Sequence, residues 1–580
     1  MNKEALVNRL NASAKRQKAD IVIKNGKIMD VYNQEWIYED IAITDGVIVG
    51  LGEYEGENTI DAEGQMIVPG FIDGHVHIES SMVTPIEFAK AVLPHGVTTV
   101  VTDPHEIANV SGEKGIVFML EQARHTPLNI HFMLPSSVPA ASFERSGAIL
   151  KAADLKPFYE EEEEEEVLGL AEVMDYVSVQ QAEEDMVQKL LDARVAGKRI
   201  DGHLAGLSTD LINIYRTAFV LNDHEVTSKE EALDRIRRGM YVMMREGSVA
   251  KNTLNVLPAV NEKNARRFFF CTDDKHVDDL LSEGSVNHQV KMAIQAGLDP
   301  FLAYQLGSLN AAECYGLDTK GAIAPGFDAD LLFVSDLENV TVTMTMVKGQ
   351  TVAEDSKAVY QDHASTAAPD QALLDSVKLA APLNKQDFHM PIDSEQQINV
   401  IQIIPNQLET RLVQVPAPDA REFEPDTEFD LLKIAVVERH KGLKETGLGV
   451  VKGFGFKSGA IATTISHDSH NIIAVGTNDE DIAAAVNKLQ EIGGGLTIIK
   501  NGEELHSVPL PIAGLLSDQS AEQVNQSLLT LHDKLSLIGF TGGFNPFLTL
   551  SFLALPVIPD IKMTTTGLFD VKSFQHISLQ

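Results

Sequence analysis

The stretch of sequence that decides the fold is VPGFIDGHVH, at residues 68–77, where an apolar run leads into a glycine-rich turn. Two of its residues, His75 and His77, stand two positions apart, and side chains at i and i+2 of a β-strand point to the same face. If the strand continues through Val76, both imidazoles project together from its C-terminal end. Neutral imidazole nitrogens are good ligands for divalent metals. The stretch therefore predicts a buried strand whose end forms one corner of a metal site.

The composition indicates a multidomain protein of the cytoplasm. A chain of 580 residues exceeds the roughly 250–300 residues at which a single core stops growing. The net charge of −37 argues against nucleic acid and anionic membranes as partners. No apolar run reaches the ~20 residues of a membrane helix, and the polar N-terminus lacks a signal-peptide core. Two cysteines fit a reducing compartment. The acidic run at 160–166 is predicted to be a solvated helix face or loop, because seven adjacent carboxylates cannot all face one ion.

The pattern of apolar runs changes near residue 66. Residues 20–64 are predicted to form a small β unit, because Asn-Gly at 25–26 and Asp-Gly at 45–46 separate β-branched runs. From 66 to about 316, eight strand candidates alternate with helical stretches, which is typical of a (β/α)₈ barrel. A doubly wound open sheet is the alternative. The strand candidates are 66–77, 98–103, 128–134, 167–172, 199–203, 220–224, 240–244 and 268–273.

Residues 321–334 and 341–347 have β patterns again, and we expect them to return and complete the first β unit. The expected fold class is α/β: a TIM-like (β/α)₈ barrel inserted in a split β-sandwich domain, followed by a C-terminal α+β domain. The expected boundaries are 1–65 for the first β-sandwich part with an N-terminal helix, 66–318 for the catalytic barrel, 319–360 for the second β-sandwich part, 361–395 for a linker, and 396–580 for the C-terminal domain.

Polar residues that can bind a metal or transfer protons end six of the eight predicted strands. In a (β/α)₈ barrel the chemistry lies at the C-terminal ends of the strands. Buried carboxylates and imidazoles carry a desolvation cost unless a metal or partners offset it, so packing alone does not explain them. The set is His75 and His77, then Asp103, His105 and Glu106, then Glu172, then Asp201 and His203, then Asp223, His224 and Glu225, and finally Asp273 and Asp274.

Structural interpretations stay open for several of these residues. His105 can cap the helix that follows it, Glu225 can lie in a first helical turn, and Asp274 can be an N-cap. Arg245, after the seventh strand, either holds a substrate or pairs with Glu246.

Together these features resemble the amidohydrolase superfamily. The residues that carry the resemblance are PGFIDGHVH at 69–77, His203, His224, the Thr-Asp pair at 272–273, and the Pro-Gly-x-x-Ala-Asp-Leu core at 325–331. The chain is more closely similar to the bacterial adenine deaminase family, nearly over its whole length, and the C-terminal part is the most specific. The motifs are VTDPHEIANV at 101–110, GLAEVM at 169–174, DGH at 201–203, CTDD at 271–274, GAIA at 459–462, SHDSHN at 466–471 and LSFLALPVIP at 550–559.

The predicted fourth strand separates this family from other members of the superfamily. Many two-metal members that open cyclic amides bridge their metals with a carbamylated lysine there, whereas residues 167–176 contain no lysine and the strand ends in Glu172. A carboxylate can bridge two metals itself. This departure counts against a cyclic-amide hydrolase of the dihydroorotase or hydantoinase kind, which remains an alternative. Deamination of another 6-substituted purine, and an inactive relative that serves as a scaffold, are the others.

The resemblance implies hydrolytic deamination of adenine to hypoxanthine and ammonia for purine salvage, with metal-activated hydroxide attacking C6. It implies two divalent metals, with Mn²⁺ or Fe²⁺ favoured and Zn²⁺ as an alternative. Asp273 is expected to take the proton of the attacking hydroxide. The implied ligands are His75, His77, Glu172 and Asp273 for one metal, and Glu172, Glu106, His203 and His224 for the other. The implied catalytic residues are Asp273, Glu172, His224 and Glu106.

Five further residues are candidates for substrate binding: His105, Asp274, Arg245, His467 and His470. His467 and His470 lie between predicted strands at 459–466 and 471–476, where they either reach the barrel mouth or satisfy a turn. A purine is the expected small-molecule partner, and we expect a homo-oligomer.

Overall fold

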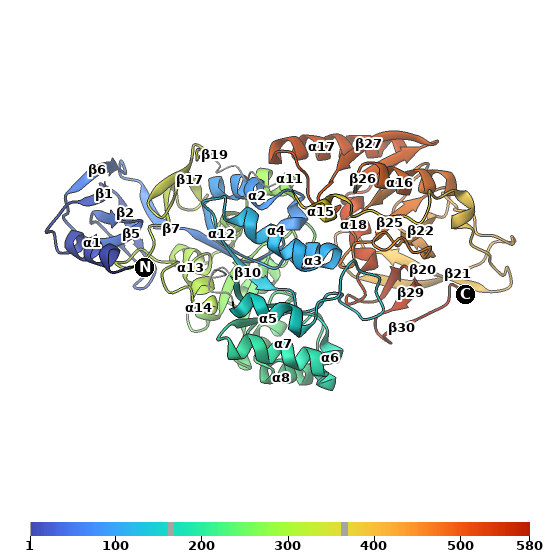
Figure 1. Cartoon of the computed structure of the whole chain (residues 1–580), viewed down its shortest axis with the longest axis horizontal. Helices are drawn as coiled ribbons and strands as arrows, with labels where there is room; N and C mark the ends of the chain where they lie inside the picture. Colours follow the sequence, from blue (N-terminus) through green and yellow to red (C-terminus); the bar gives the residue numbers. More distant parts are fainter. Residues whose placement is uncertain (1, 161–166, 361–368) are drawn as a thin grey trace.

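The structure is a computed structural model that describes residues 2–160, 167–360 and 369–580. Figure 1 shows an elongated molecule with a β domain at one end, a barrel in the middle and the C-terminal domain at the other end. Six residues of the predicted solvated acidic run, 161–166, lie outside the described residues. Among the described residues, no helix is long and apolar enough to span a membrane.

The β domain is built from both sides of the barrel segment, which confirms the predicted split. Its larger sheet has the order β19-β18-β17-β16-β7-β2-β3, in which β7 pairs antiparallel with β16 and parallel with β2. The second sheet has the order β5-β4-β1-β6, and α1 (Lys3–Ser13) packs against it. The strands are β1 (Ala19–Lys24), β2 (Lys27–Asp30), β3 (Glu35–Ile37), β4 (Ile41–Thr44), β5 (Val47–Leu51), β6 (Gly56–Asp61), β7 (Met66–Pro69), β16 (Leu331–Asp336), β17 (Thr341–Val347), β18 (Gln350–Glu354) and β19 (Lys357–Ala358).

The middle of the chain is a closed parallel barrel rather than the alternative open sheet. Parallel pairing runs along β12-β11-β10-β9-β8 and along β13-β14-β15. The sheet closes where Asp273 donates its N–H to the His75 carbonyl at 2.9 Å, and Leu221 to the Ile200 carbonyl at 2.9 Å. The barrel strands are β8 (Phe71–Val76), β9 (Val97–Thr102), β10 (Asn129–Leu134), β11 (Val167–Val173), β12 (Arg199–Gly202), β13 (Asn222–Asp223), β14 (Tyr241–Arg245) and β15 (Phe268–Cys271).

The first predicted barrel strand, 66–77, is two strands in the structure. Its first half is β7 of the β domain, and the barrel begins only with β8. Gly70 between them packs so closely on β9 that a Cβ there would lie 2.1 Å from Thr98 Oγ1. One apolar run therefore contains strands of two different sheets. The hydrophobic pattern does not reveal the boundary between them, because both strands are buried.

Helices follow the barrel strands and cover the outside of the barrel (Figure 1). Local sequence explains where they begin, since Ser208 and Ser228 accept N–H groups of the first turns of α8 and α9. The helices of this segment are α2 (Pro85–Val92), α3 (His105–Ser111), α4 (Glu113–Ala123), α5 (Ala152–Glu160), α6 (Tyr176–Gln181), α7 (Glu184–Val195), α8 (Thr209–Thr217), α9 (Lys229–Arg237), α10 (Thr253–Val256), α11 (Val277–Ser282), α12 (Val286–Gln295), α13 (Pro300–Leu306) and α14 (Leu309–Tyr315).

The C-terminal domain has two described sheets, with the orders β21-β20-β23-β22-β25-β24-β26-β27 and β28-β29-β30. Its helix α16 begins at Asp479, because Asn478 is the N-cap and accepts the Asp481 N–H at 2.8 Å. The elements are β20 (Gln397–Ile403), β21 (Thr410–Pro416), β22 (Leu431–Val437), β23 (Thr446–Lys452), β24 (Ala460–Thr463), β25 (Ile472–Gly476), α16 (Asp479–Glu491), β26 (Gly495–Lys500), β27 (Glu503–Pro509), α17 (Ala521–Lys534), α18 (Pro546–Ser551), β28 (Ile561–Thr564), β29 (Gly567–Asp570) and β30 (Gln575–His576).

The described part of the predicted linker packs onto this domain. Residues 361–368 lie outside the described residues. After them, α15 (Gln371–Leu374) is held by Ala513, which donates its N–H to the Leu373 carbonyl at 2.7 Å, and Phe388 is fully buried in the domain core. Residues 369–395 therefore belong structurally to the C-terminal domain, because their few apolar side chains find a surface that the sequence pattern does not show.

Candidate metal-dependent active site

Four imidazoles and two carboxylates from five strand ends meet inside the mouth of the barrel. His75 lies in β8 and His77 follows directly after its last residue, and both side chains are buried. The His77 Nε2 atom lies 3.1 Å from Glu172 Oε1 and 3.1 Å from Asp273 Oδ1. His75 Nε2 lies 3.4 Å from the same Asp273 oxygen. The strand-end geometry thus gathers residues up to 198 positions apart in the chain, His75 and Asp273, into one buried group.

Glu172 stands at the centre of this group, and its two oxygens face different imidazoles. Oε1 faces His75 at 3.8 Å and His77 at 3.1 Å. Oε2 faces His203 Nδ1 at 2.9 Å and His224 Nε2 at 3.3 Å. Burial alone would raise the pKa of the Glu172 carboxyl, but the imidazole hydrogen bonds hold that pKa well below its usual range. An ionised carboxylate therefore lies between two sets of nitrogen ligands.

Asp273 is held ionised by a buried ion pair. Arg245 donates from Nη1 to Asp273 Oδ2 at 2.7 Å and from Nη2 to Glu225 Oε2 at 3.0 Å. Burial alone would raise the pKa of the Asp273 carboxyl, but the Arg245 guanidinium and the neighbouring imidazoles hold it well below its usual range. The alternative that Arg245 pairs with Glu246 is wrong: Glu246 accepts the Thr253 N–H instead. Glu225, interpreted from sequence as a helix-dipole residue, is a partner of Arg245.

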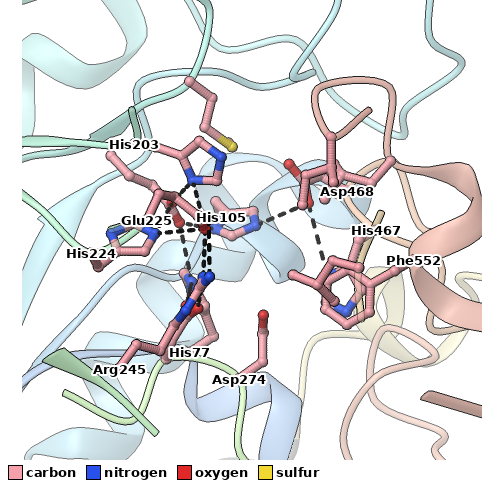
Figure 2. Close-up of a pocket in the computed structure, with 16 residues that line it drawn as sticks. His77, His105, His203, His224, Glu225, Arg245, Asp274, His467, Asp468 and Phe552 are labelled. Carbon is pink, nitrogen blue, oxygen red and sulfur yellow. Dashed lines mark hydrogen bonds and ion pairs between the residues drawn. The ribbon is translucent and has the colours of Figure 1, made fainter. Parts of the chain in front are cut away.

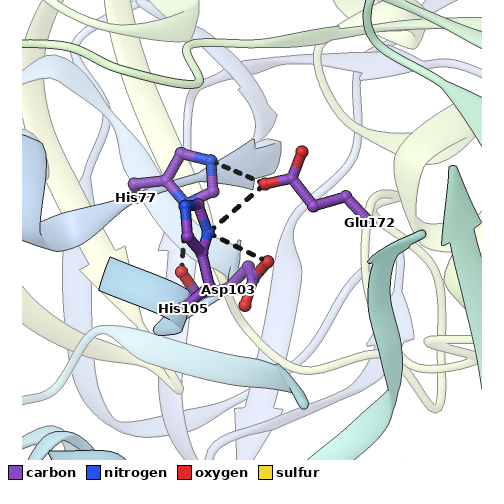
Figure 3. Close-up of side chains that lie close together, drawn as sticks. All are labelled: His77, Asp103, His105 and Glu172. Carbon is purple, nitrogen blue, oxygen red and sulfur yellow. Dashed lines mark hydrogen bonds and ion pairs between the residues drawn. The ribbon is translucent and has the colours of Figure 1, made fainter. Parts of the chain in front are cut away.

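His105 connects the barrel to the C-terminal domain. Its Nδ1 atom lies 3.2 Å from Asp103 Oδ2 and 3.4 Å from Glu172 Oε1, the arrangement drawn in Figure 3. Its Nε2 atom lies 3.4 Å from Asp468 Oδ1. His105 does not cap the following helix. The N-cap of α3 is Pro104, and no side chain makes a capping hydrogen bond there.

Glu106 does not lie in the set around Glu172, contrary to the sequence prediction. The chain turns into α3 after β9, which places Glu106 in the first helical turn. Its candidate metal-binding group consists of Glu106, His467 and His470, whose ligand atoms lie within 4.8 Å of one another. His470 Nδ1 accepts the Ser466 N–H at 3.2 Å, so a neutral His470 carries its proton on Nε2, which faces Glu106 Oε2 at 3.6 Å. This tautomer suits a hydrogen-bond donor and not a metal ligand.

Ser80 links Glu106 to the cavity. Its Oγ lies 2.7 Å from Glu106 Oε1 and 2.5 Å from Asp274 Oδ1. A hydroxyl carries one proton, so one of the two carboxyls has a proton of its own and donates it to Ser80. Burial, with Glu79 and Asp274 nearby, raises the pKa of Glu106 well above its usual range. Asp274 is not the N-cap of α11, which is His276.

The two sides of the site face each other across a small cavity. Figure 2 shows the metal-capable side chains on one side and His467, Asp468 and Phe552 of the C-terminal domain on the other. Phe552 stacks on His467 with a centroid separation of 4.3 Å. The lining residues are His77, His105, Glu172, Met174, His203, His224, Glu225, Arg245, Asp273, Asp274, Leu408, His467, Asp468, Phe552, Leu555 and Ile558.

The barrel residues fit a divalent metal pair. The atoms His75 Nε2, Glu172 Oε1 and His203 Nε2 are buried without hydrogen-bond partners among the described residues. His77 Nδ1 lies 3.0 Å from the Asp103 carbonyl, which keeps a proton on Nδ1, so that Nε2 is the nitrogen that would bind a metal. Burial and His224 lower the pKa of His75 to about 4, so its imidazole is neutral. Candidate metal-binding groups are thus present, in keeping with a metal-dependent superfamily.

Sequence reasoning missed Asp468, Phe552 and the role of Glu225. Asp468 and Phe552 belong to a separate domain. The available signal was that they lie within the quoted motifs at 466–471 and 550–559, which do not show that these residues reach the barrel.

A closed parallel barrel with a HxH strand end and a split β domain defines the class of this protein. The Amidohydrolase family model matches residues 66–352, so the catalytic part is of the amidohydrolase type. The model named Adenine deaminase C-terminal domain matches residues 407–575. The chain belongs to the adenine deaminase family.

Relatives of similar length support this assignment. The chain is 98% identical over 580 residues to a protein named adenine deaminase from Bacillus subtilis (strain 168), with 100% of both chains covered. It is 55% identical over 577 residues to the adenine deaminase of Geobacillus kaustophilus (strain HTA426), with 99% of both covered. Among solved structures, a β-aspartyl dipeptidase from Fervidobacterium islandicum AW-1 is similar at 19% identity and a TM-score of 0.46, covering 59% of this chain and 99% of that one.

Proposed function

We propose that this chain catalyses the hydrolytic deamination of adenine to hypoxanthine and ammonia. The observation that carries the proposal is Glu172, whose two oxygens face separate imidazole sets beside the ionised Asp273. Its relatives over the full length are named adenine deaminases. The reaction adds one water across C6: a C–O bond forms, the C6–N6 bond breaks, and the amine leaves as ammonia.

Two divalent metals would be held by His75, His77 and Asp273 on one side of Glu172 and by His203 and His224 on the other, with Glu172 shared. Such a pair lowers the pKa of water toward neutrality and so supplies hydroxide at pH 7. The mixture of imidazole and carboxylate ligands favours Mn²⁺ or Fe²⁺, with Zn²⁺ as the alternative. Glu106 is left out of this proposal, because its Oε2 atom lies 3.6 Å from His470 Nε2 of the C-terminal domain.

Two acid–base residues of the chain complete the reaction. Asp273 takes the proton of the attacking water, since Arg245 keeps its carboxylate ionised and ready to accept. Ring N1 must gain a proton as charge develops there. Asp274 lines the cavity, and the Ser80 hydroxyl contacts both Asp274 and Glu106. The proton for N1 comes from this group of two carboxyls and one hydroxyl. His224 lies beside Glu172 and is placed to hydrogen-bond the attacking oxygen.

The location, the small-molecule partner and the oligomeric state predicted from the sequence are also part of the proposal. Both cysteines, Cys271 and Cys314, are free and buried, which agrees with a cytoplasmic location. A free purine is the proposed partner of the cavity, and a homo-oligomer is the proposed assembly.

The test is the Glu172→Gln variant, which keeps the side-chain shape and removes one ligand oxygen. We expect its kcat/KM for adenine to fall by about 10³-fold or more, since the nucleophile depends on the shared carboxylate. Bound metal should also drop below two equivalents per chain. Ultraviolet absorbance follows adenine and hypoxanthine, and elemental analysis follows the metal. Glu491→Gln, at an exposed glutamate, is the control.

Near wild-type turnover by both Glu172→Gln and Asp273→Asn would contradict the site assignment. Dihydroorotate and hydantoin are assayed beside adenine. Turnover of these cyclic amides, with none of adenine, would favour the alternative reaction. A purified chain with no transition metal and no activation by Mn²⁺ would favour the scaffold alternative.

A further inference from the structure

The C-terminal domain contributes one carboxylate to the active-site cavity. Asp468 lies in the segment between β24 and β25 and is only 3% exposed. It lines the cavity together with Leu408, Phe552 and Ile558. Figure 2 shows it across the cavity from the imidazoles of the barrel. An acidic side chain in an otherwise largely apolar wall needs a physical reason.

One oxygen of Asp468 faces an imidazole of the barrel, and the other faces no hydrogen-bond donor among the described residues. Oδ1 faces His105 Nε2 at 3.4 Å. Oδ2 is buried and accepts no hydrogen bond from the described residues. A buried acceptor without a donor costs about 1–3 kcal/mol, and more when it is charged. A carboxylate accepts hydrogen bonds and does not donate them, so the missing partner is a donor that enters the cavity.

We propose that Asp468 selects the free base by accepting a hydrogen bond from the N–H of the five-membered purine ring. This inference rests on the proposed deaminase function. Adenine has two kinds of N–H donor: the exocyclic amine at C6 and the N–H of the five-membered ring. The amine belongs at the reacting end, beside Glu172 and Asp273. The ring N–H lies at the opposite end of the bicyclic base and therefore meets the opposite wall.

The geometry matches this orientation. The His105 ring separates the two carboxylates, with Nδ1 3.4 Å from Glu172 Oε1 and Nε2 3.4 Å from Asp468 Oδ1. A bicyclic base that lies alongside this imidazole extends from one carboxylate toward the other.

The same contact rejects nucleosides and other N9-substituted purines. In them the ring N–H is replaced by a carbon substituent, so Asp468 Oδ2 would stay buried without a donor. The substituent would also point into the wall formed by Leu408, Leu555 and Ile558. A site built to hydrogen-bond an N–H discriminates strongly against analogues that lack it, by about 10⁴-fold in well-packed sites.

The test compares adenine with 9-methyladenine, which has no ring N–H, on the metal-loaded full-length enzyme. We expect the wild type to prefer adenine in kcat/KM by about 10³-fold or more. In Asp468→Ala, kcat/KM for adenine should fall by about 10²-fold while that for 9-methyladenine stays within a few-fold, so the preference collapses. Asp468→Asn keeps the volume of the side chain and serves if the alanine variant does not fold. The control is Asp481→Asn, a buried carboxylate of the same domain outside the cavity, which accepts the Gly502 N–H.

Calorimetric binding of hypoxanthine and 9-methylhypoxanthine gives a second measurement that needs no turnover. The wild type should bind the free base more tightly, and Asp468→Ala should lose this difference. An unchanged preference in Asp468→Ala, or an equal loss for both compounds, would overturn the inference and leave a positioning role through His105. Absence of adenine turnover by the wild type would contradict the proposed function alone, because the binding comparison would still test Asp468.

Discussion

Arg245 is the residue on which the charge of the proposed base depends. It lies 3% exposed between two carboxylates, Asp273 and Glu225, and pairs with both. Removing one partner of a buried ion pair leaves the other charge buried without compensation. The stability lost in this way exceeds the net stability that the intact pair contributes. The acid–base state of Asp273 is therefore set by a residue on the neighbouring strand.

We predict that Arg245→Met moves the acid limb of the pH profile to higher pH. Without the guanidinium, burial raises the pKa of Asp273, so its carboxylate is protonated and inactive at a higher pH than in the wild type. The acid limb of log kcat/KM for adenine should shift upward by about one pH unit or more, with a loss of about 10-fold or more at pH 7.

Arg245→Lys keeps the positive charge and should shift the limb less. Arg238→Met, on the surface where Arg238 pairs with Asp234, is the control and should leave the profile in place. An unmoved acid limb in Arg245→Met would show that Asp273 does not depend on this ion pair.

At the scale of elements, the spacing of β11 and β12 sets the distance between Glu172 and His203. Gly169 of β11 allows this spacing, because a Cβ there would lie 2.0 Å from the carbonyl oxygen of Arg199 in β12. Backbone cannot move aside as a flexible side-chain end can. The glycine is required by the close approach of two strands.

We predict that Gly169→Ala destabilises the protein by about 1–3 kcal/mol, since the two strands must move apart. It should also lower adenine turnover more than the loss of folded protein explains, because the two site residues separate. Thermal unfolding and kcat measured on the folded fraction check this prediction. Gly543→Ala is the matched control, since no atom lies within 4 Å of a Cβ at that position. A stable, fully active Gly169→Ala protein would contradict the argument.

At the scale of the whole molecule, the C-terminal domain docks on the barrel and completes its mouth. Arg145 pairs with Glu445 at 2.7 Å, and Asn471 donates to the Arg145 carbonyl at 2.7 Å. On the other side, Ser517 donates its N–H to the Met82 carbonyl at 2.8 Å. These contacts hold the segment that carries His467 and Asp468 against the barrel.

Glu144, in the barrel loop beside Ser469, gives this junction a pH dependence. Burial and the nearby Asp468 raise the pKa of Glu144 to about 8. Between the ordinary glutamate value of about 4.3 and pH 8, the folded protein keeps a proton that the unfolded chain releases. The contribution of the protonated Glu144 to folding stability is therefore complete below about pH 4.3. It decreases as pH rises above this value and is lost once the pH has passed about 8.

We predict that Glu144→Gln, which does not titrate, gains stability relative to the wild type between pH 5 and pH 8. One pH unit corresponds to about 1.4 kcal/mol, and Glu144 is partly exposed, so a gain of about 1–3 kcal/mol is expected. The measurement is the difference in Tm between variant and wild type at the two pH values. Glu491→Gln should show no such change, and a pH-independent difference for Glu144→Gln would exclude the raised pKa.

The sequence by itself determined the barrel and most of the metal-capable residues. Strand period and strand-end polarity are local properties, so His75, His77, Glu172, His203 and Asp273 were found without coordinates. The boundary at Gly70 was not found, because two buried strands in succession have one hydrophobic pattern.

Only the tertiary structure decided what lies opposite the strand ends. Glu106 was grouped with the metal ligands because it follows a barrel strand, whereas the turn into α3 directs it to His470. Arg245 was left between two roles until the fold brought it against Glu225 and Asp273. Asp468 reaches the cavity from a separate domain, and no local pattern encodes such a contact. The HxH pair marked the metal side of the site, and docking of the C-terminal domain formed the side that meets the base.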